Sequence, residues 1–296
     1  MALLNRLIQL SLALASALAA QTENLPWMPS DAARVSAAQQ AEFLAEICPG
    51  HATAAGCEVC PADTGLPQNE QWQIIAITFG HFLSPSSDDA LISGRGCEPH
   101  VENYSGSFLF SRNSSTWKKV RYEAGLQAWT CKKLAAADGR GRLVCAATDQ
   151  HQGVQDAFLY LLDPGLDPKS IDPLRGDPRG TLFFDVMTNL GAFCVGPNVD
   201  AAQQETITRV AFQPLAGPNS VRIVVDARAG KAVVPKSVAE KVCSKTGFPS
   251  DLRIAALSRR YLFIFDGQKI IPASTNPPTE YQVTAVAPRT SYTVAK

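Results

Sequence analysis

The chain has 296 residues, 46% of them hydrophobic, and balances 27 basic side chains against 27 acidic ones. Its densest basic cluster is Lys118, Lys119 and Arg121. The charge pattern therefore excludes a basic footprint for nucleic acid or for an anionic membrane surface. The length suffices for one large β domain or two small ones.

Residues 1–20 are typical of a signal peptide. Arg6 precedes an apolar run over residues 7–18, and Ala17-Leu18-Ala19 ends it with a small-x-small pattern. This run is shorter than the ~20 residues that a membrane-spanning helix needs, and no later run is long enough. We therefore predict a mature chain that is secreted or periplasmic and has no membrane span. An uncleaved N-terminal anchor is the alternative.

Residues 21–70 are predicted to form one helix and a cysteine-rich connector. Ser30 or Asp31 offers an N-cap, and Pro49-Gly50 ends the helical pattern. The segment between them is rich in Ala, Glu and Gln, which favour helix. Its apolar face is predicted to consist of Val35, Phe43, Leu44 and Ile47.

Residues 71–271 carry a β pattern that repeats. Each repeat has an aliphatic strand, a loop and an aromatic strand, and the third repeat holds an insertion at about residues 231–250 that includes a short helical pattern. The loop after residue 163 is irregular and leads to a strand, TLFFDVMTN. Residues 272–296 form a Pro/Thr-rich tail with a candidate closing strand. The aliphatic and aromatic strands are 91–92 with 108–110, 143–145 with 158–160, and 223–225 with 261–265.

Short strands separated by turn signals predict an all-β fold. A propeller blade of four strands takes about 40 to 50 residues, so the spacing of the repeats favours a β-propeller-like domain of about four or five blades. A β-sandwich with an N-terminal helix is the alternative.

The segment from Gly80-His81-Phe82 through Asp88-Asp89 to Ala90-Leu91-Ile92 resembles the FG-GAP or VCBS-type repeat. That resemblance implies propeller blades, and in the family a loop with several carboxylates often binds calcium. Here each loop has only one or two Asp, fewer than Ca²⁺ prefers. We therefore interpret Asp88, Asp89 and Asp138 as turn residues that bond nearby backbone, and we expect no cofactor, with calcium as the alternative.

Eight cysteines in an exported chain predict disulfides. Cys131 and Cys145 flank a compact turn and are the first expected pair. By position, Cys194 is expected to pair with Cys243, and Cys97 to join Cys48, Cys57 and Cys60. The spacing of Cys48, His51, Cys57 and Cys60 also fits a tetrahedral zinc site, which oxidation of the thiols would prevent.

The candidate binding residues are His81, Asp88, Asp89 and His100. No nucleophile or second acid lies at a recognisable spacing from either histidine, and Trp117 and Trp129 are interpreted as core aromatics. The sequence thus favours a non-catalytic binding or interaction protein whose ligand is a protein or a carbohydrate. The alternative is an extracellular hydrolase acting on carbohydrate, which requires two carboxylates ~5 to 10 Å apart in a central pocket.

Overall fold

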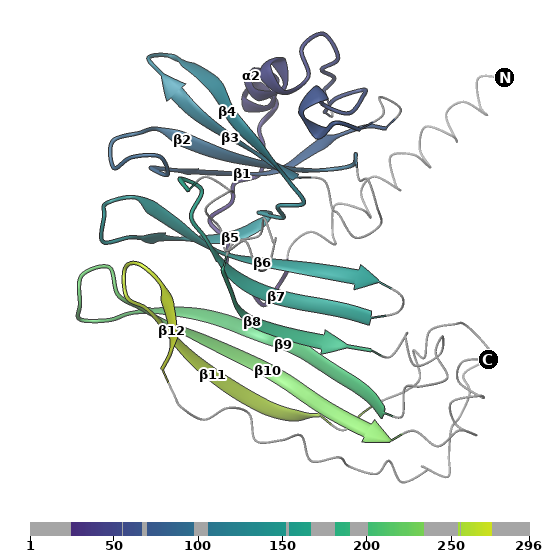
Figure 1. Ribbon diagram of the computed structural model, residues 1–296, viewed down its shortest axis with the longest axis vertical. Helices are drawn as coiled ribbons and strands as arrows, with labels where there is room; N and C mark the ends of the chain where they lie inside the picture. The colour runs from purple at the N-terminus through teal and green to yellow at the C-terminus, as the bar shows by residue number, and fades with distance from the viewer. Residues whose placement is uncertain are drawn as a thin grey trace, which may run out of the picture. The chain divides into compact units, whose positions relative to one another are not determined.

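The computed structural model describes residues 25–54, 56–66, 70–97, 106–151, 154–166, 181–189, 201–233, 254 and 256–273. In these residues the strands form three four-stranded antiparallel sheets, in the orders β1-β2-β3-β4, β5-β6-β7-β8 and β12-β11-β10-β9 (Figure 1). The prediction of an all-β fold is therefore confirmed.

Each sheet follows the chain as a meander, with every strand beside its neighbour in sequence. The first sheet contains β1 (Gln73–Gly80), β2 (Asp89–Arg95), β3 (Gly106–Asn113) and β4 (Thr116–Ala124). The second contains β5 (Thr130–Ala135), β6 (Gly141–His151), β7 (Val154–Leu162) and β8 (Thr181–Thr188). The third contains β9 (Ala201–Pro214), β10 (Val221–Val233), β11 (Leu257–Phe265) and β12 (Ile270–Pro272).

The chain divides into two compact units. The first comprises Met1–Ala147 and Tyr160–Thr181, and the second comprises Thr148–Leu159 and Leu182–Lys296. The first sheet lies wholly in the first unit, and the third sheet lies wholly in the second.

The three sequence repeats correspond to the three sheets. In each sheet the aliphatic and aromatic strands are the second and third strands, namely β2 with β3, β6 with β7, and β10 with β11. The predicted strand TLFFDVMTN is β8. The insertion falls between β10 and β11, and its helical pattern lies outside the described residues, as do the loop from residue 167 and the tail beyond Ala273.

The helix begins later than the sequence predicted. Helix α2 spans Ala37–Ile47, and its N-cap is Ser36, whose side chain accepts a hydrogen bond from the backbone N–H of Gln39. The prediction of Ser30 or Asp31 as N-cap was wrong, because the residues from Ser30 to Ala33 are bonded to strands instead. The signal that identifies the true start is the Ser-x-x-Gln capping pattern at Ser36.

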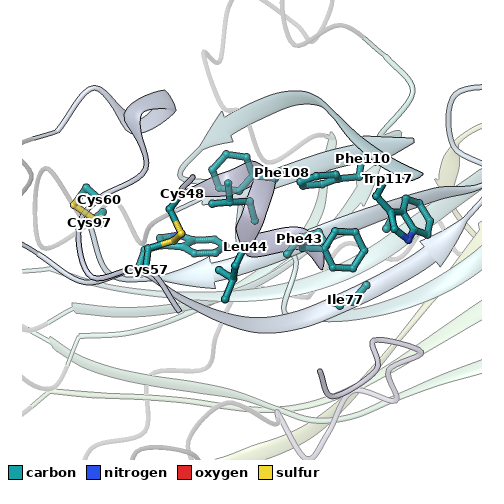
Figure 2. Close-up of a cluster of buried hydrophobic side chains, with 14 residues drawn as sticks. Phe43, Leu44, Cys48, Cys57, Cys60, Ile77, Cys97, Phe108, Phe110 and Trp117 are labelled. Carbon is teal, nitrogen blue, oxygen red and sulfur yellow. A yellow bond between two sulfur atoms is a disulfide. The ribbon is translucent and has the colours of Figure 1, made fainter. Parts of the chain in front are cut away.

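The core of the first unit lies between α2 and the first sheet (Figure 2). Phe43 is fully buried and contacts Phe110 edge-on, with ring centroids 5.0 Å apart, and Trp117 at 5.4 Å. Burying an aromatic or aliphatic side chain contributes about 1.5–3 kcal/mol, so Phe43, Leu44 and Ile47 together hold the helix on the sheet. These three confirm the predicted apolar face; Val35 precedes the helix and is half-buried.

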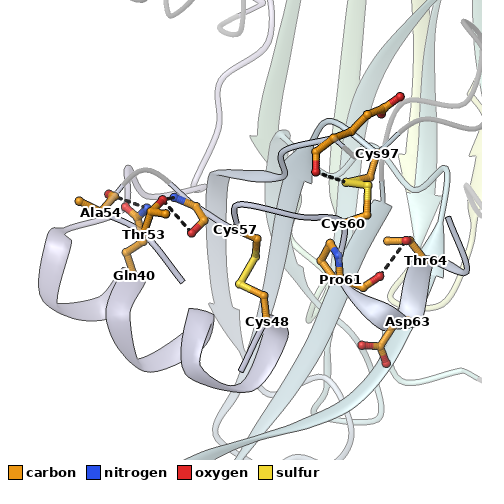
Figure 3. Close-up of a disulfide and its surroundings, with 12 residues drawn as sticks. Gln40, Cys48, Thr53, Ala54, Cys57, Cys60, Pro61, Asp63, Thr64 and Cys97 are labelled. Carbon is orange, nitrogen blue, oxygen red and sulfur yellow. Dashed lines mark hydrogen bonds between the residues drawn. A yellow bond between two sulfur atoms is a disulfide. The ribbon is translucent and has the colours of Figure 1, made fainter. Parts of the chain in front are cut away.

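Three disulfides occur in the described part of the chain. Cys48–Cys57 ties the end of α2 to the connector, and Cys60–Cys97 ties the connector to the end of β2 (Figure 3). Cys131–Cys145 joins directly opposite positions on β5 and β6, as predicted. Cys194 and Cys243 lie outside the described residues.

These disulfides favour an oxidising setting, extracellular or periplasmic. Among the residues that the structure describes, no helix has the length and apolarity to cross a bilayer.

Candidate functional site

The β1–β2 loop holds three of the four residues that the sequence singled out for binding. His81 is exposed, and its Nδ1 is in hydrogen-bond contact with the carbonyl of Ser87. Asp88 is exposed and pairs with Arg112 on β3 at 3.3 Å. The fourth candidate, His100, lies outside the described residues.

Asp89 stabilises the β1–β2 loop rather than binding a ligand. Its side chain is fully buried, and Oδ2 accepts hydrogen bonds from the backbone N–H groups of Phe82 and Leu83 at 2.7 and 2.8 Å and from the Ser87 hydroxyl. Oδ1 accepts one from the hydroxyl of Ser111. A cation site needs oxygen ligands around the ion, whereas donors surround this carboxylate. Asp89 therefore fixes the loop, which is the turn role that the sequence predicted.

Two carboxylates approach each other near the β5–β6 turn, but arginines occupy both. Arg142 donates from the same Nη2 to Asp138 and Asp163, at 2.9 Å each, and Arg140 contacts Asp138 at 2.9 Å and Asp163 at 3.2 Å. The backbone N–H of Arg140 and both guanidinium groups hold the pKa of Asp138 well below its usual range. These side chains therefore form a fixed ion cluster, and Asp138 lacks the raised pKa that a general acid requires.

The zinc alternative loses its ligands to oxidation. Cys48, Cys57 and Cys60 are all in disulfides, so none offers a thiolate to a metal. Within the described ranges, no group of three or more His, Cys, Asp or Glu side chains could hold a metal ion.

The N-terminal lead, defined here as Ser30–Val35, lies between two strands of the first unit. Its Asp31 N–H donates to the Cys131 carbonyl on β5 at 2.7 Å, and the Ser30 hydroxyl accepts from the Cys131 N–H at 3.0 Å. On the other side, Ala33 exchanges two backbone hydrogen bonds with Ile77 on β1. Because β1 and β5 each stand at one end of their sheet order, the lead covers two strand edges that would otherwise lack partners.

A pocket of about 230 Å³ opens beside this lead, which we call the lead pocket. It lies next to an irregularity in β1, where the pairing with β2 shifts between Ile74 and Ala76. Bulges of this kind are frequent beside binding sites, because they end regular pairing and redirect side chains. The wall includes Val35, Ile74 and Ile75, and the polar groups come from Arg34 and Gln40.

The polar groups of the lead pocket are left open to a ligand. Arg34 is exposed and makes no hydrogen bond or ion pair with the described residues. Gln40 donates its Nε2 to the Ala54 carbonyl at 3.0 Å, which orients its Oε1 as a fixed acceptor. Trp129 also lines the pocket, and its Nε1 donates to the Gly94 carbonyl at 3.3 Å. None of the described residues that line this pocket carries a carboxylate.

The sequence missed this pocket. Trp117 is buried in the core as predicted, but Trp129 is only half-buried and forms part of the wall. Arg34 and Trp129 come together only because the lead bonds to β1 and β5, and no spacing in the sequence signals that contact.

Compared with protein-family models, curated proteins and solved structures, the chain matches none.

Proposed function

We propose that this chain is an exported, disulfide-stabilised, propeller-like binding protein whose lead pocket takes a small ligand with an apolar body and one acidic group. The observation that carries the proposal is the composition of that pocket. The guanidinium of Arg34, which has no partner among the described residues, stands beside apolar side chains and an oriented amide oxygen. Arginine recognises carboxylates and phosphates through its planar set of donors, and Val35, Ile74 and Ile75 add an apolar patch to a lining whose exposed surface is otherwise mostly polar.

The propeller-like part of the proposal rests on the repeats. Each described sheet is a four-stranded meander, which is the construction of a propeller blade. The stretch similar to the FG-GAP repeat, from Gly80 to Ile92, supplies the β1–β2 loop and the start of β2 in the first of them. The third sheet keeps the aliphatic strand, β10, and the aromatic strand, β11, with the insertion between these two strands.

A binding role without catalysis is supported by the state of the acidic residues. Two arginines neutralise the carboxylates of Asp138 and Asp163, and among the described residues that line the lead pocket Arg34 is the one ionisable side chain. Hydrolysis of a glycosidic bond needs one carboxyl group that is protonated near neutral pH, and the lowered pKa of Asp138 is the opposite of that requirement.

The test is a binding assay that compares matched acids and amides. Small carboxylates such as benzoate and 4-methylpentanoate would be titrated against the mature chain, together with benzamide and 4-methylpentanamide, with Trp fluorescence and ligand-observed NMR as readouts. The acids are expected to bind and the amides to bind at least ~10-fold more weakly, because a charged contact contributes more than a neutral one.

Two variants locate the binding site. Arg34→Gln should weaken binding of the acids, whereas Arg112→Gln, which removes an equally exposed cation paired with Asp88, should leave it unchanged. Equal binding of acids and amides, or equal binding by both variants, would refute the proposal. Release of reducing sugar from a neutral polysaccharide, abolished by Asp163→Asn, would refute the non-catalytic part.

A further inference from the structure

The third sheet has one apolar face and one arginine-rich face. Alternate residues of β10 point to opposite faces, and Ile223, Val225 and Ala227 are buried on the first of these. Phe263 on β11 lies on the same side and packs against Phe183 of β8, with ring centroids 5.2 Å apart. The core of the second unit therefore covers this face. The other face carries the apolar pair Val224 (8% exposed) and Leu262 in addition to polar groups.

The strand register brings four arginines to that other face, which we call the outer face. Asp226 on β10 lies opposite Arg209 on β9 and Arg260 on β11. On β10, Arg228 comes two residues after Asp226 and Arg222 comes four residues before it, so all three side chains are on the same face. Because two residues of an antiparallel strand span about 6.8 Å, the side chains from Arg222 to Arg228 extend over roughly 20 Å of the face.

One of these arginines forms an ion pair with Asp226, and a second acts on the same carboxylate through its charge. Asp226 is the single carboxylate among the outer-face positions of β9, β10 and β11. Arg260 binds it through two contacts of 2.6 and 3.2 Å, and this hydrogen bonding holds the pKa of Asp226 below its usual value. Arg209, Arg222 and Arg228 are exposed and form no hydrogen bond or ion pair with the described residues. Arg209 lies opposite Asp226, and its charge also helps to lower the pKa of that carboxyl, so among the described residues Arg222 and Arg228 are the two arginines of the outer face that interact with no carboxylate.

We propose that the outer face of the third sheet binds a linear anionic polysaccharide through its sulfate or carboxylate groups. Guanidinium groups bind these oxyanions bidentately, and their repetition along an extended strand fits acidic groups repeated along a chain. Between the arginines, Gln213, Thr206 and Ser258 are exposed at outer-face positions and can hydrogen-bond sugar hydroxyls.

The composition of the face favours a polysaccharide over a nucleic acid. Single-stranded nucleic acids are held by stacking of bases on aromatic side chains, and the outer-face positions paired along β9, β10 and β11 carry none. The oxidising setting favoured by the disulfides is also where such polysaccharides meet an exported protein.

The experiment uses the full mature chain and four probes: a heparin dodecasaccharide, a dextran oligosaccharide of similar size, a 12-nucleotide single-stranded DNA, and phosphatidylglycerol vesicles. Binding would be measured by calorimetry and by sedimentation at two salt concentrations. We expect heparin to bind, with an affinity that falls as salt rises, and dextran, DNA and vesicles to bind at least ~10-fold more weakly.

A matched pair of triple variants assigns the surface. Arg209→Gln/Arg222→Gln/Arg228→Gln should weaken heparin binding at least ~10-fold. Arg112→Gln/Lys118→Gln/Lys132→Gln removes the same charge from the first unit, where Arg112 and Lys118 are exposed and Lys132 is half-buried, and should leave binding unchanged. Circular dichroism checks that both fold. Equal loss in both variants, no binding of heparin, or binding of DNA or vesicles as tight as that of heparin would overturn the proposal.

Discussion

Replacement of Asp89 by Asn should destabilise the first unit far more than the same change at its neighbour, Asp88. Asp89 is completely buried and accepts four hydrogen bonds, two of them from the backbone N–H groups of Phe82 and Leu83. Asp88 has a side chain that is 54% exposed and a single ion pair, at 3.3 Å from Arg112. The two residues are adjacent in sequence, so the pair isolates the effect of the buried network.

The magnitude follows from the hydrogen bonds. In Asp89→Asn the best arrangement turns the amide nitrogen toward Ser111, whose hydroxyl can rotate to accept, and leaves the amide oxygen to the other three donors. Those three hydrogen bonds then have a neutral amide oxygen as acceptor instead of a charged carboxylate, which costs about 1 kcal/mol each. The free energy of unfolding should therefore fall by about 3 kcal/mol. Asp88→Asn should change it by less than about 0.5 kcal/mol, as surface ion pairs do.

The assay is urea unfolding at pH 7 with the disulfides intact, followed by circular dichroism and compared at constant m-value. The reasoning is refuted if Asp89→Asn and Asp88→Asn differ by less than about 0.5 kcal/mol. The same assay addresses calcium, because a site that binds only the folded chain raises stability with ligand concentration. Since donors surround Asp89, addition of calcium chloride should leave the wild-type midpoint unchanged.

Two further predictions concern the β5–β6 hairpin. Cys131→Ser/Cys145→Ser should lower the free energy of unfolding by about 3 kcal/mol, because the bond closes a loop with a sequence separation of 14; a loss below ~1 kcal/mol in urea unfolding would contradict this. Asp138 has a pKa lowered by Arg140 and Arg142, so its contribution to stability is present above the unfolded pKa of about 4 and is lost as pH falls. The urea midpoint should therefore fall less steeply between pH 5 and pH 2 in Asp138→Asn than in wild type. If the midpoints of the two proteins fell in parallel with pH, the arginines would not act on this carboxyl.

Local chemistry made part of this structure predictable from sequence. Asp89 and Asp138 could be predicted as turn residues because a short carboxylate bonds backbone donors a few residues away, and both do so. Cys131 and Cys145 could be predicted as a pair because a compact turn between two strands brings its flanks opposite each other. In each case the partner lies close in the chain.

The start of the helix and the gathering of the outer-face arginines depend on contacts between residues that are far apart in the sequence. Ser30 has the chemistry of an N-cap, but its hydroxyl bonds Cys131, a residue 101 positions away, so the helix starts at Ala37 instead. The outer-face arginines look scattered in sequence, and only the register of β9 and β11 on β10 gathers them. A one-residue slip in that register would move the side chains of a strand to the other face.

The lead explains why the proposed pocket and the disulfide framework belong together. Cys131 anchors the lead through its backbone N–H and carbonyl while its side chain is bonded to Cys145 on β6. The position of the lead is thus fixed by a strand that is itself cross-linked, and Arg34 follows directly from the bonded residue Ala33. A ligand that pairs with Arg34 therefore meets a guanidinium whose backbone is already ordered, so little ordering entropy opposes binding. On this argument the disulfides of the first unit act on the pocket as well as on the stability of the fold.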